Sequence, residues 1–388
     1  MRSLEAGLCP CDTTQAGSTA KGNQAVAGLR AGKRLSDMDD PNSCESSPPL
    51  LLRRKVRLSK DHHSIYALRF SADSKRLAVG FGNGAVQLLE AETGAVQREV
   101  CQGHRTQEAA MCISFHPLQP SLLLVGSADG NLNIYDWELG SEPVTISGSA
   151  FTAEENNEIN ALDFSLDGGI FATAGKDRSI RLYDSLTNQV CNVFEAPDVR
   201  SWDDLSLTSG HTKRIFALRF HPEEHHTFLT GGWDRALKVW DKRAAKSAQR
   251  SIGGPHICGA GIDIQGNSVV TASWVPSEAL QLWDLRSLRV EKVLRFPTSL
   301  SQGQFLYTAR FCHSDCVLAG GSGTSSAHIT NINTNQVLGG IHLNNKAVQT
   351  LDSALGGQLI AVGGIGGNLS IGGLQRALGG SCHPQLSL

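Results

Sequence analysis

The chain has 388 residues and a formal net charge of -2, so its overall charge favours neither a nucleic acid nor a membrane surface as a partner. It contains no apolar run of about 18 residues, the length that a membrane span requires. Its first residues lack the long apolar region of a secretory signal, and its 10 cysteines are scattered, as in proteins of a reducing compartment. These features predict a cytoplasmic or nuclear protein with no membrane partner and no specific nucleic-acid partner.

The first segment of the chain, residues 1–50, is poor in aromatic residues and rich in Ser, Gly, Ala, Asp and Pro. Such a composition cannot bury enough apolar surface to offset the entropy lost on ordering, so we expect a disordered N-terminal tail. Residues 51–378 are expected to form one β domain, and residues 379–388 a C-terminal tail. At the start of the domain, Val56–Ser59 alternates like a strand and belongs to no repeat.

A repeated strand pattern follows. Each unit opens with an alternating segment. The residues that end the first six of these segments lie 44 to 56 residues apart along the chain. The opening segments are Ile65–Phe70, Met111–Phe115, Ile159–Phe164, Ile215–Phe220, a weaker one ending near Ile264, Leu306–Phe311, and one near Ala347–Leu351.

Each opening segment is followed by two further apolar strands and, in most units, a shorter polar strand suited to an exposed edge. The seventh unit lacks a convincing fourth strand after Leu374, whereas Val56–Ser59 is a spare strand. If the spare strand completes the last unit, the units close into a ring without an open sheet edge. The 41 glycines agree with an all-β, turn-rich protein.

One stretch, Phe228–Arg243, is the most regular copy of the unit: strand, turn Gly231–Asp234, strand ending Trp240-Asp241. With Gly210-His211 some twenty residues earlier, it resembles a blade of the WD40-repeat β-propeller family, in which each unit carries a Gly-His and a Trp-Asp pair. The resemblance implies a seven-bladed WD40 propeller closed by an N-terminal strand. It also implies a non-enzymatic scaffold for protein–protein assembly, without a cofactor or metal.

In WD40 blades a His, a Ser or Thr, an Asp and a Trp form a hydrogen-bonded tetrad, and the fourth unit matches it in full with His211, Thr230, Asp234 and Trp240. A His and an Asp at this spacing could also be a catalytic base and the group that orients it. Because the same arrangement recurs at repeat spacing, we interpret it as structural. Other units keep only part of the tetrad.

The resemblance further implies that proteins or peptides dock around the central channel, on the face that carries the turns before the first strand and between the second and third strands. A mixture of aromatic, thioether and basic side chains aligns to those positions, and the cores of protein interfaces favour such a mixture. The predicted partner-binding residues are Tyr66, Met111, Lys176, Arg214, Phe216, Trp233 and Tyr307. The alternative is that several of them only pack the mouth of the channel.

Two alternative functions remain. Phe228–Arg243 also resembles the pattern ending Trp-Asp-x-Arg of WD40 substrate receptors of cullin-RING ubiquitin ligases, and Trp283–Arg286 is a second, less regular copy. There, Arg243 and Arg286 would contact the ligase adaptor. A propeller hydrolase with a metal in its channel is the other alternative, and Asp163, Asp263 and Asp352 on the opening strands are too few for it.

Overall fold

The computed structural model describes residues 50–58, 63–104, 108–147, 157–197, 210–244, 248–298 and 303–374. They all belong to the second of two compact units, Ser46–Leu388, and the first unit, Met1–Glu45, contains none of them. The described residues are strands and turns, with one short 3-10 turn at Leu355–Gly357. None of them forms a helix long and apolar enough to span a bilayer.

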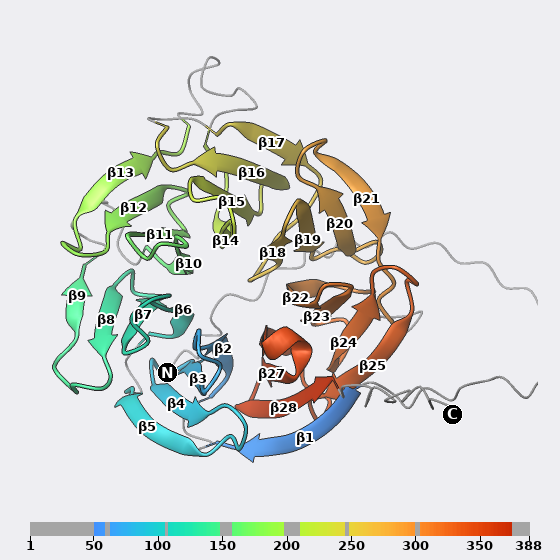
Figure 1. Cartoon of the computed structure of the whole chain (residues 1–388), viewed down its shortest axis with the longest axis horizontal. Coiled ribbons are helices and arrows are strands. Elements are labelled where there is room, and N and C mark those ends of the chain that lie inside the picture. Colours follow the sequence, from blue (N-terminus) through green and yellow to red (C-terminus); the bar gives the residue numbers. More distant parts are fainter. Residues whose placement is uncertain are drawn as a thin grey trace, which may run out of the picture. The chain divides into compact units, whose positions relative to one another are not determined.

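Seven four-stranded antiparallel sheets, here called blades, surround a central axis, and the first strand of each blade lies nearest to it (Figure 1). Blade 1 is β2 (Ile65–Phe70), β3 (Arg76–Phe81), β4 (Val86–Glu90) and β5 (Val96–Cys101). Blade 2 is β6 (Ala110–Phe115), β7 (Leu122–Ser127), β8 (Leu132–Asp136) and β9 (Val144–Ile146). Blade 3 is β10 (Ile159–Phe164), β11 (Ile170–Gly175), β12 (Ile180–Asp184) and β13 (Val190–Phe194). Blade 4 is β14 (Ile215–Phe220), β15 (Thr227–Gly232), β16 (Ala236–Asp241) and β17 (Arg250–Gly253).

The remaining blades follow the same order. Blade 5 is β18 (Ile262–Gln265), β19 (Ser268–Ala272), β20 (Leu280–Asp284) and β21 (Arg289–Val293). Blade 6 is β22 (Leu306–His313), β23 (Cys316–Gly321), β24 (Ser326–Asn331) and β25 (Val337–His342). Blade 7 is β26 (Val348–Ala354), β27 (Leu359–Gly364), β28 (Asn368–Leu374) and β1 (Leu50–Arg57). The seven-bladed fold predicted from the sequence is therefore confirmed.

The ring is closed by β1, which pairs antiparallel with β28 and supplies the fourth strand of blade 7. The pairing matches Val56 with Leu369 and Leu50 with Leu374, so the first strand of the chain completes the last blade. The predicted bounds of this strand, Val56–Ser59, were wrong, because it begins at Leu50 and ends at Arg57. A register shift between Leu52 and Arg54 interrupts the alternation, which explains why the sequence pattern showed only its end.

The apolar core is divided among the interfaces between neighbouring blades, which we call the joints of the ring. Seven apolar clusters each draw on two neighbouring blades, one cluster for each joint. The joint between blades 7 and 1, for example, packs Leu359 and Ile371 against Ile65 and Phe81, with Val56 of β1 at its edge. Since burying one such side chain contributes about 1.5–3 kcal/mol, leaving a joint open would expose apolar surface on both neighbouring blades.

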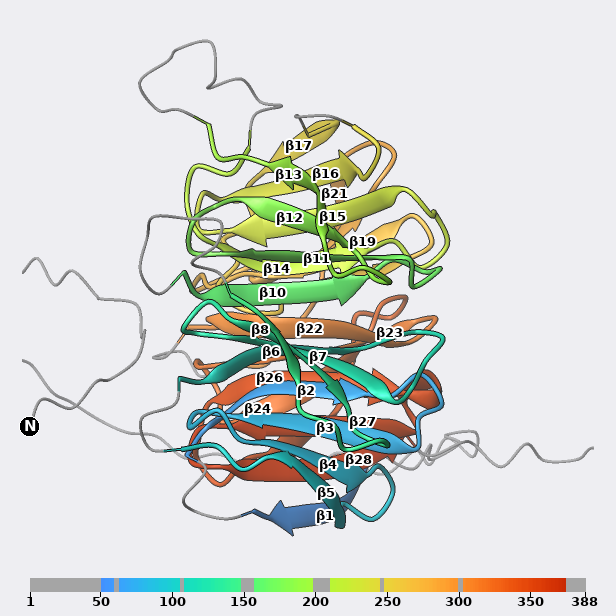
Figure 2. The same ribbon diagram turned by 90° about the vertical axis from the view of Figure 1, so that its left-hand side faces the viewer.

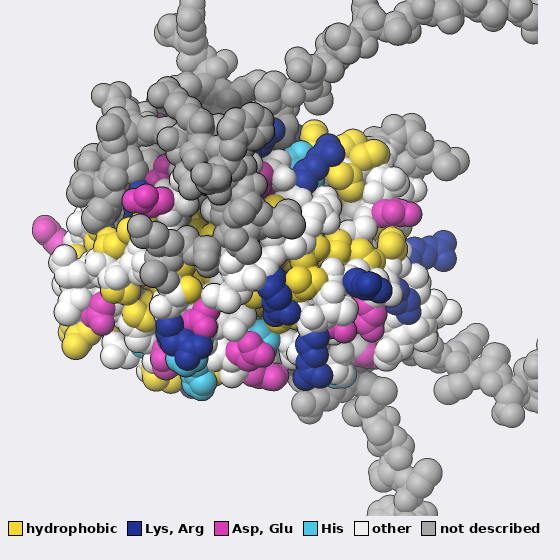
Figure 3. Space-filling view, turned by 90° about the horizontal axis from the view of Figure 1, so that it is seen from above, with side chains coloured by type: hydrophobic (Ala, Val, Ile, Leu, Met, Phe, Trp, Pro, Cys, Tyr) yellow, Lys and Arg dark blue, Asp and Glu magenta, His cyan; other side chains and the backbone are white. Residues whose placement is uncertain are grey.

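The two predicted tails lie outside the described residues, apart from Leu50, which begins β1. Seen edge-on, the first strands of the blades run in the same direction across the ring, so that one face carries their beginnings and the other carries their ends (Figure 2). On the side of the molecule in Figure 3, acidic and basic side chains are interspersed rather than segregated.

Candidate functional site

The four predicted tetrad residues of blade 4 lie together in its interior. The His211 ring places Nδ1 2.8 Å from Asp234 Oδ2 and Nε2 2.6 Å from Thr230 Oγ1. Trp240 Nε1 donates to the same hydroxyl at 2.7 Å. Burial opposes the ionisation of Asp234, but the hydrogen bond from His211 and the backbone amide of Thr212 outweigh it and lower the pKa of Asp234. The imidazole is fully buried, so it has no solvent-facing atom with which to act on a substrate.

The other blades replace the missing members of the tetrad in different ways. Blade 5 keeps the bond from Trp283 Nε1 to Thr271 Oγ1, at 2.9 Å. In blade 3, Asp177 pairs with Arg181 of β12 instead of a histidine. Each substitute still gives a buried polar group a partner, which is the requirement that the tetrad meets in blade 4.

One face of the ring carries the predicted partner-binding residues, and a recurring backbone bond defines it. In six blades the residue after the second strand donates its N–H to the carbonyl of the residue that precedes the first strand. In blade 5 the donor lies two residues after β19 and the acceptor six residues before β18. The pairs, from blade 1 to blade 7, are Gly82–Ser64, Ala128–Ala109, Lys176–Glu158, Trp233–Arg214, Trp274–His256, Ser322–Phe305 and Ile365–Ala347. The sequence alignment that placed these turns side by side therefore agrees with the geometry.

Next to this bond, the first strand carries a register shift at its second residue in six of the seven blades. A bulge re-aims the side chain of the extra residue and often occurs next to a functional site. The six residues at this position are Tyr66, Met111, Asn160, Phe216, Tyr307 and Gln349. Four of them are predicted partner-binding residues. The bulge itself was not predicted, because a one-residue shift leaves the alternating pattern almost unchanged.

The predicted residues of blade 4 form a compact group on this face. The Arg214 guanidinium lies 5.7 Å from the centre of the Trp233 ring, and the Phe216 and Trp233 ring centroids are 5.3 Å apart. Arg214 Nη1 also contacts Glu158 Oε2 of the neighbouring blade at 2.8 Å. The ion pair and the ring hold the guanidinium in place while a third of the Arg214 side chain stays accessible.

The remaining predicted residues, Tyr66, Met111, Lys176 and Tyr307, are also half-buried. Together with the blade 4 group they make up what we call the rim. Sequence reasoning missed two aromatic residues of the same face, Trp274 and Phe305, whose ring centroids are 4.9 Å apart. Trp274 occupies in blade 5 the position of Trp233 in blade 4, so aligning the two blades at this turn would have found it.

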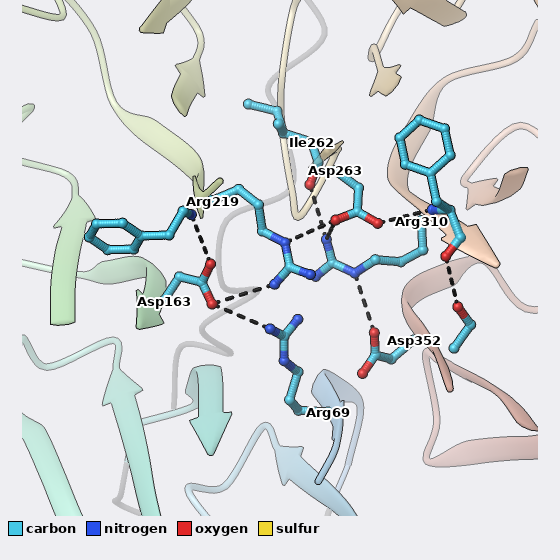
Figure 4. A network of polar contacts seen from close by, with 10 residues as sticks. Arg69, Asp163, Arg219, Ile262, Asp263, Arg310 and Asp352 are labelled. Atoms are coloured by element: carbon cyan, nitrogen blue, oxygen red, sulfur yellow. Dashed lines mark hydrogen bonds and ion pairs between the residues drawn. The ribbon is translucent and has the colours of Figure 1, made fainter. Parts of the chain in front are cut away.

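Three arginines and three aspartates from the first strands meet at the axis of the ring (Figure 4). Arg219 of blade 4 bridges two aspartates, with Nε 2.9 Å from Asp263 Oδ1 and Nη1 3.4 Å from Asp163 Oδ1. Arg310 of blade 6 lies 3.9 Å from Asp263 Oδ1 and 3.4 Å from Asp352 Oδ1. We call these six residues, which also include Arg69, the axial network.

Each aspartate of the axial network also ties its blade to the next. The second carboxylate oxygen of Asp163 accepts the backbone N–H of Phe220 at 2.9 Å, and Asp263 does the same for Phe311 at 3.0 Å. Asp352 of blade 7 accepts the N–H of Phe70 of blade 1 at 2.8 Å, which fastens the joint where the ring closes.

The alternation of charge around the axis explains the one neutral position. The fifth residue of the first strand is Arg in blades 1, 4 and 6 and Asp in blades 3 and 7, and Asp263 of the shorter strand β18 takes the equivalent place in blade 5. In blade 2 the fifth residue is the buried Ser114. Seven positions cannot alternate in sign all the way round, so a neutral residue between Arg69 and Asp163 avoids a pair of like charges. Across this gap, Arg69 Nη2 reaches Asp163 Oδ1 at 3.3 Å.

The electrostatics of the axial network bear on the channel-metal alternative. Burial and the guanidinium of Arg219 lower the pKa of Arg310 to about 10. Burial opposes the ionisation of Asp263, but Arg219 and Arg310 outweigh it and lower its pKa. All three axial aspartates thus have arginine and backbone N–H partners. Among the described residues, no cluster of three or more His, Cys, Asp or Glu residues has the arrangement of a metal site.

The two arginines of the Trp-Asp-x-Arg segments lie against their own blades. Arg243 contacts both carboxylate oxygens of Asp241, at 3.0 Å from Nε and 2.6 Å from Nη2, and 64% of its side chain is exposed. The hydrogen bond from Arg243 is the main reason why the pKa of Asp241 falls to about 2. Arg286 is exposed, and its Nε donates to Asn267 Oδ1 at 3.0 Å.

A closed ring of seven four-stranded blades with a His–Thr–Asp–Trp tetrad defines a β-propeller built from WD repeats. Comparison with protein families agrees: the model "WD domain, G-beta repeat" matches residues 146–184 and 202–241, and "Anaphase-promoting complex subunit 4 WD40 domain" matches residues 55–117. These matches and the seven-bladed ring support the assignment of the chain to the WD40-repeat β-propellers.

Several curated proteins are similar to this chain at low identity. "Nuclear distribution protein nudF" of Aspergillus niger is 28% identical over 37% of this chain and 28% of its own length. "Cell division cycle 20.1, cofactor of APC complex" of Arabidopsis thaliana is 22% identical over 71% and 56%, and "GATOR2 complex protein WDR24" of Danio rerio is 27% identical over 42% and 19%. The chain thus spans between about a fifth and just over half of the length of these relatives.

Proposed function

We propose that the protein is a non-enzymatic scaffold of a cytoplasmic or nuclear complex and that it binds partner proteins or peptides at the rim. The observation that carries the proposal is the group formed by Arg214, Phe216 and Trp233. An arginine that is held by an ion pair and lies against an aromatic ring loses little conformational entropy on binding, and Trp, Tyr and Arg are the side chains that contribute most at interfaces.

Two further features support this assignment. The register shifts at the second residue of six first strands lie beside the turns that carry the rim residues, and bulges often occur next to functional sites. The relatives are named as components or cofactors of complexes, which agrees with a scaffold role. The axial network gives the three channel aspartates a structural role, and this supports binding over hydrolysis.

Affinity capture tests the proposal. We expect Trp233→Ala and Arg214→Ala each to reduce recovery of a specific partner at least about tenfold, the effect of losing about 1.4 kcal/mol of binding energy. Val290→Ser, on the outer strand β21, is the matched control and should leave recovery unchanged. Equal recovery from all the variants would contradict a role for the rim.

A substrate receptor of a cullin-RING ubiquitin ligase is a second candidate, since Arg243 belongs to the most complete blade and its side chain is 64% exposed. Its bidentate contact with Asp241 would have to be shared with or exchanged for an adaptor contact. Capture with Arg243→Ala and Arg286→Ala, with Arg289→Ala as an exposed-arginine control, tests this candidate. Loss of a ligase adaptor from the first two variants alone would support it, and equal recovery from all three would exclude these arginines as the contact.

A further inference from the structure

The large apolar side chains that are exposed in the described part of the ring have an uneven distribution. Four are valines on outer strands, namely Val96, Val144, Val290 and Val293. The other five are leucines, and each lies in a turn after the first or the third strand of a blade, at the opposite ends of these strands from the rim. They are Leu118, Leu139, Leu166, Leu186 and Leu355.

Three of these leucines belong to the turns between the first and second strands, which surround the end of the channel farthest from the rim. Leu118 of blade 2 is 70% exposed, Leu166 of blade 3 is 42% exposed and Leu355 of blade 7 is 52% exposed. The turns of blades 2 and 3 are in contact, because a Cβ atom on Gly168 would lie 2.5 Å from His116 Cε1. We call the seven turns of this type the turn face.

The turn face is also acidic. Its residues are 71–75, 116–121, 165–169, 221–226, 266–267, 314–315 and 355–358, and they contain five carboxylates and one lysine. Arg76 and Lys242 lie against two of the carboxylates, Asp73 and Asp167. The exposed Glu223 and Glu224 of blade 4 carry most of the remaining negative charge. The half-buried Asp315 of blade 6, whose Oδ1 lies 2.8 Å from His313 Nδ1, carries the rest, and all three lie on the side of the ring away from blade 2.

We propose that the turn face is a second docking surface and that its occupant is a basic amphipathic helix of a partner protein. Leucines on one part of the face would receive the apolar side of such a helix, and the carboxylates of blades 4 and 6 would meet its Lys and Arg side chains. This proposal does not depend on the rim, which lies at the other ends of the same strands.

The charge of the turn face distinguishes this occupant from two others. A second copy of the chain docked face to face would bring the carboxylates of both copies together, and like charges that face each other across an interface cost binding energy. The cytoplasmic surface of a membrane carries anionic lipids, which the same carboxylates would repel. A basic helix satisfies both the apolar and the charged part of the face.

The test uses the full chain and a fluorescein-labelled 18-residue peptide of Leu and Lys in amphipathic helical order, with binding followed by anisotropy. We expect the variant Leu118→Ser/Leu166→Ser/Leu355→Ser to bind at least about tenfold more weakly. Val96→Ser/Val290→Ser and Trp233→Ala should bind as the unchanged chain does. Glu223→Gln/Glu224→Gln should weaken binding and flatten its dependence on salt. Because the substituted leucines are exposed, thermal melts should show that each variant still folds.

Three results would overturn the proposal. One is equal binding of a peptide in which every Lys is replaced by Glu, since the face would then not select for charge. Another is unchanged binding by the triple leucine variant. The third is that light scattering or vesicle sedimentation shows self-association or lipid binding that the triple variant abolishes, which would assign the leucines to a second copy of the chain or to a membrane.

Discussion

Replacing Asp263 by Ala is the perturbation that bears most directly on the axial network, because this carboxylate is shared by three partners. Asp263 Oδ1 accepts a hydrogen bond from Arg219 Nε at 2.9 Å and lies 3.9 Å from Arg310 Nη1. Its Oδ2 accepts a hydrogen bond from the backbone N–H of Phe311 at 3.0 Å. Only 6% of Asp263 is exposed, so water cannot replace these contacts without entering the channel.

The magnitude follows from what the substitution leaves behind. Arg219 keeps an ion pair with Asp163 at 3.4 Å, and Arg310 keeps one with Asp352 at 3.4 Å, but three arginines then share two carboxylates. Removing one partner of a buried ion pair costs about 3–5 kcal/mol, which includes the charge left uncompensated. We therefore expect Asp263→Ala to lower the free energy of unfolding by about 3–5 kcal/mol at neutral pH.

The sign of the pH dependence is fixed by the depressed pKa of Asp263. Its stabilising contribution is complete above the unfolded-state pKa, about 3.9, and is lost as the pH falls through the lower folded-state pKa. The stability difference between the unchanged chain and Asp263→Ala should shrink over that window. Urea denaturation followed by tryptophan fluorescence at several pH values measures it.

The matched control is Ser114→Ala, the uncharged equivalent position in blade 2. It removes one buried hydroxyl and should cost about 1 kcal/mol, with no dependence on the ionisation of an axial carboxylate. If Asp263→Ala costs no more than Ser114→Ala at neutral pH, the axial network does not stabilise the ring.

Three further results are expected. Thr230→Val should cost about 2–4 kcal/mol in urea denaturation, because it leaves the buried Trp240 Nε1–H without an acceptor and the buried His211 Nε2 without its hydroxyl partner. Thr271→Val, which leaves one buried group unpaired, should cost about half as much, and equal costs would contradict the tetrad geometry. Arg243→Ala should raise the pKa of Asp241 from about 2 towards its ordinary value in a carboxylate NMR titration, and an unchanged pKa would show that the contact is absent in solution. Val56→Asp should lower the midpoint of thermal unfolding by the equivalent of about 2 kcal/mol, since it places a charge at the edge of the joint between blades 7 and 1; an unchanged midpoint would mean that β1 does not seal that joint.

The sequence predicted the ring because each first strand, such as Ile215–Phe220, repeats the same alternation at nearly constant intervals. It also predicted the contacts of His211, since all members of the blade 4 tetrad fall within about thirty residues. The strand alternation and the tetrad both depend on residues that are close together in the sequence, so the sequence of a single repeat is enough to recognise them.

The axial network could not be predicted in the same way. Asp163, Asp263 and Asp352 drew attention only as metal ligands, whereas their arginine partners lie on other blades, as far as 94 residues away for the pair Arg69–Asp163. Only the closure of the ring determines which first strands face one another across the axis. Aligning the sequences of the first strands would have shown the alternation of Arg and Asp, although not which pairs form.

We propose above all that a partner protein binds at the rim, and site-specific photo-crosslinking tests this most directly. A photoreactive residue placed at Phe216 or Tyr66 should crosslink to the same partner protein, whereas one at Val290 on the outer strand should crosslink to none. Crosslinking from Val290 with none from Phe216 and Tyr66 would place the partner elsewhere on the ring and contradict the claim.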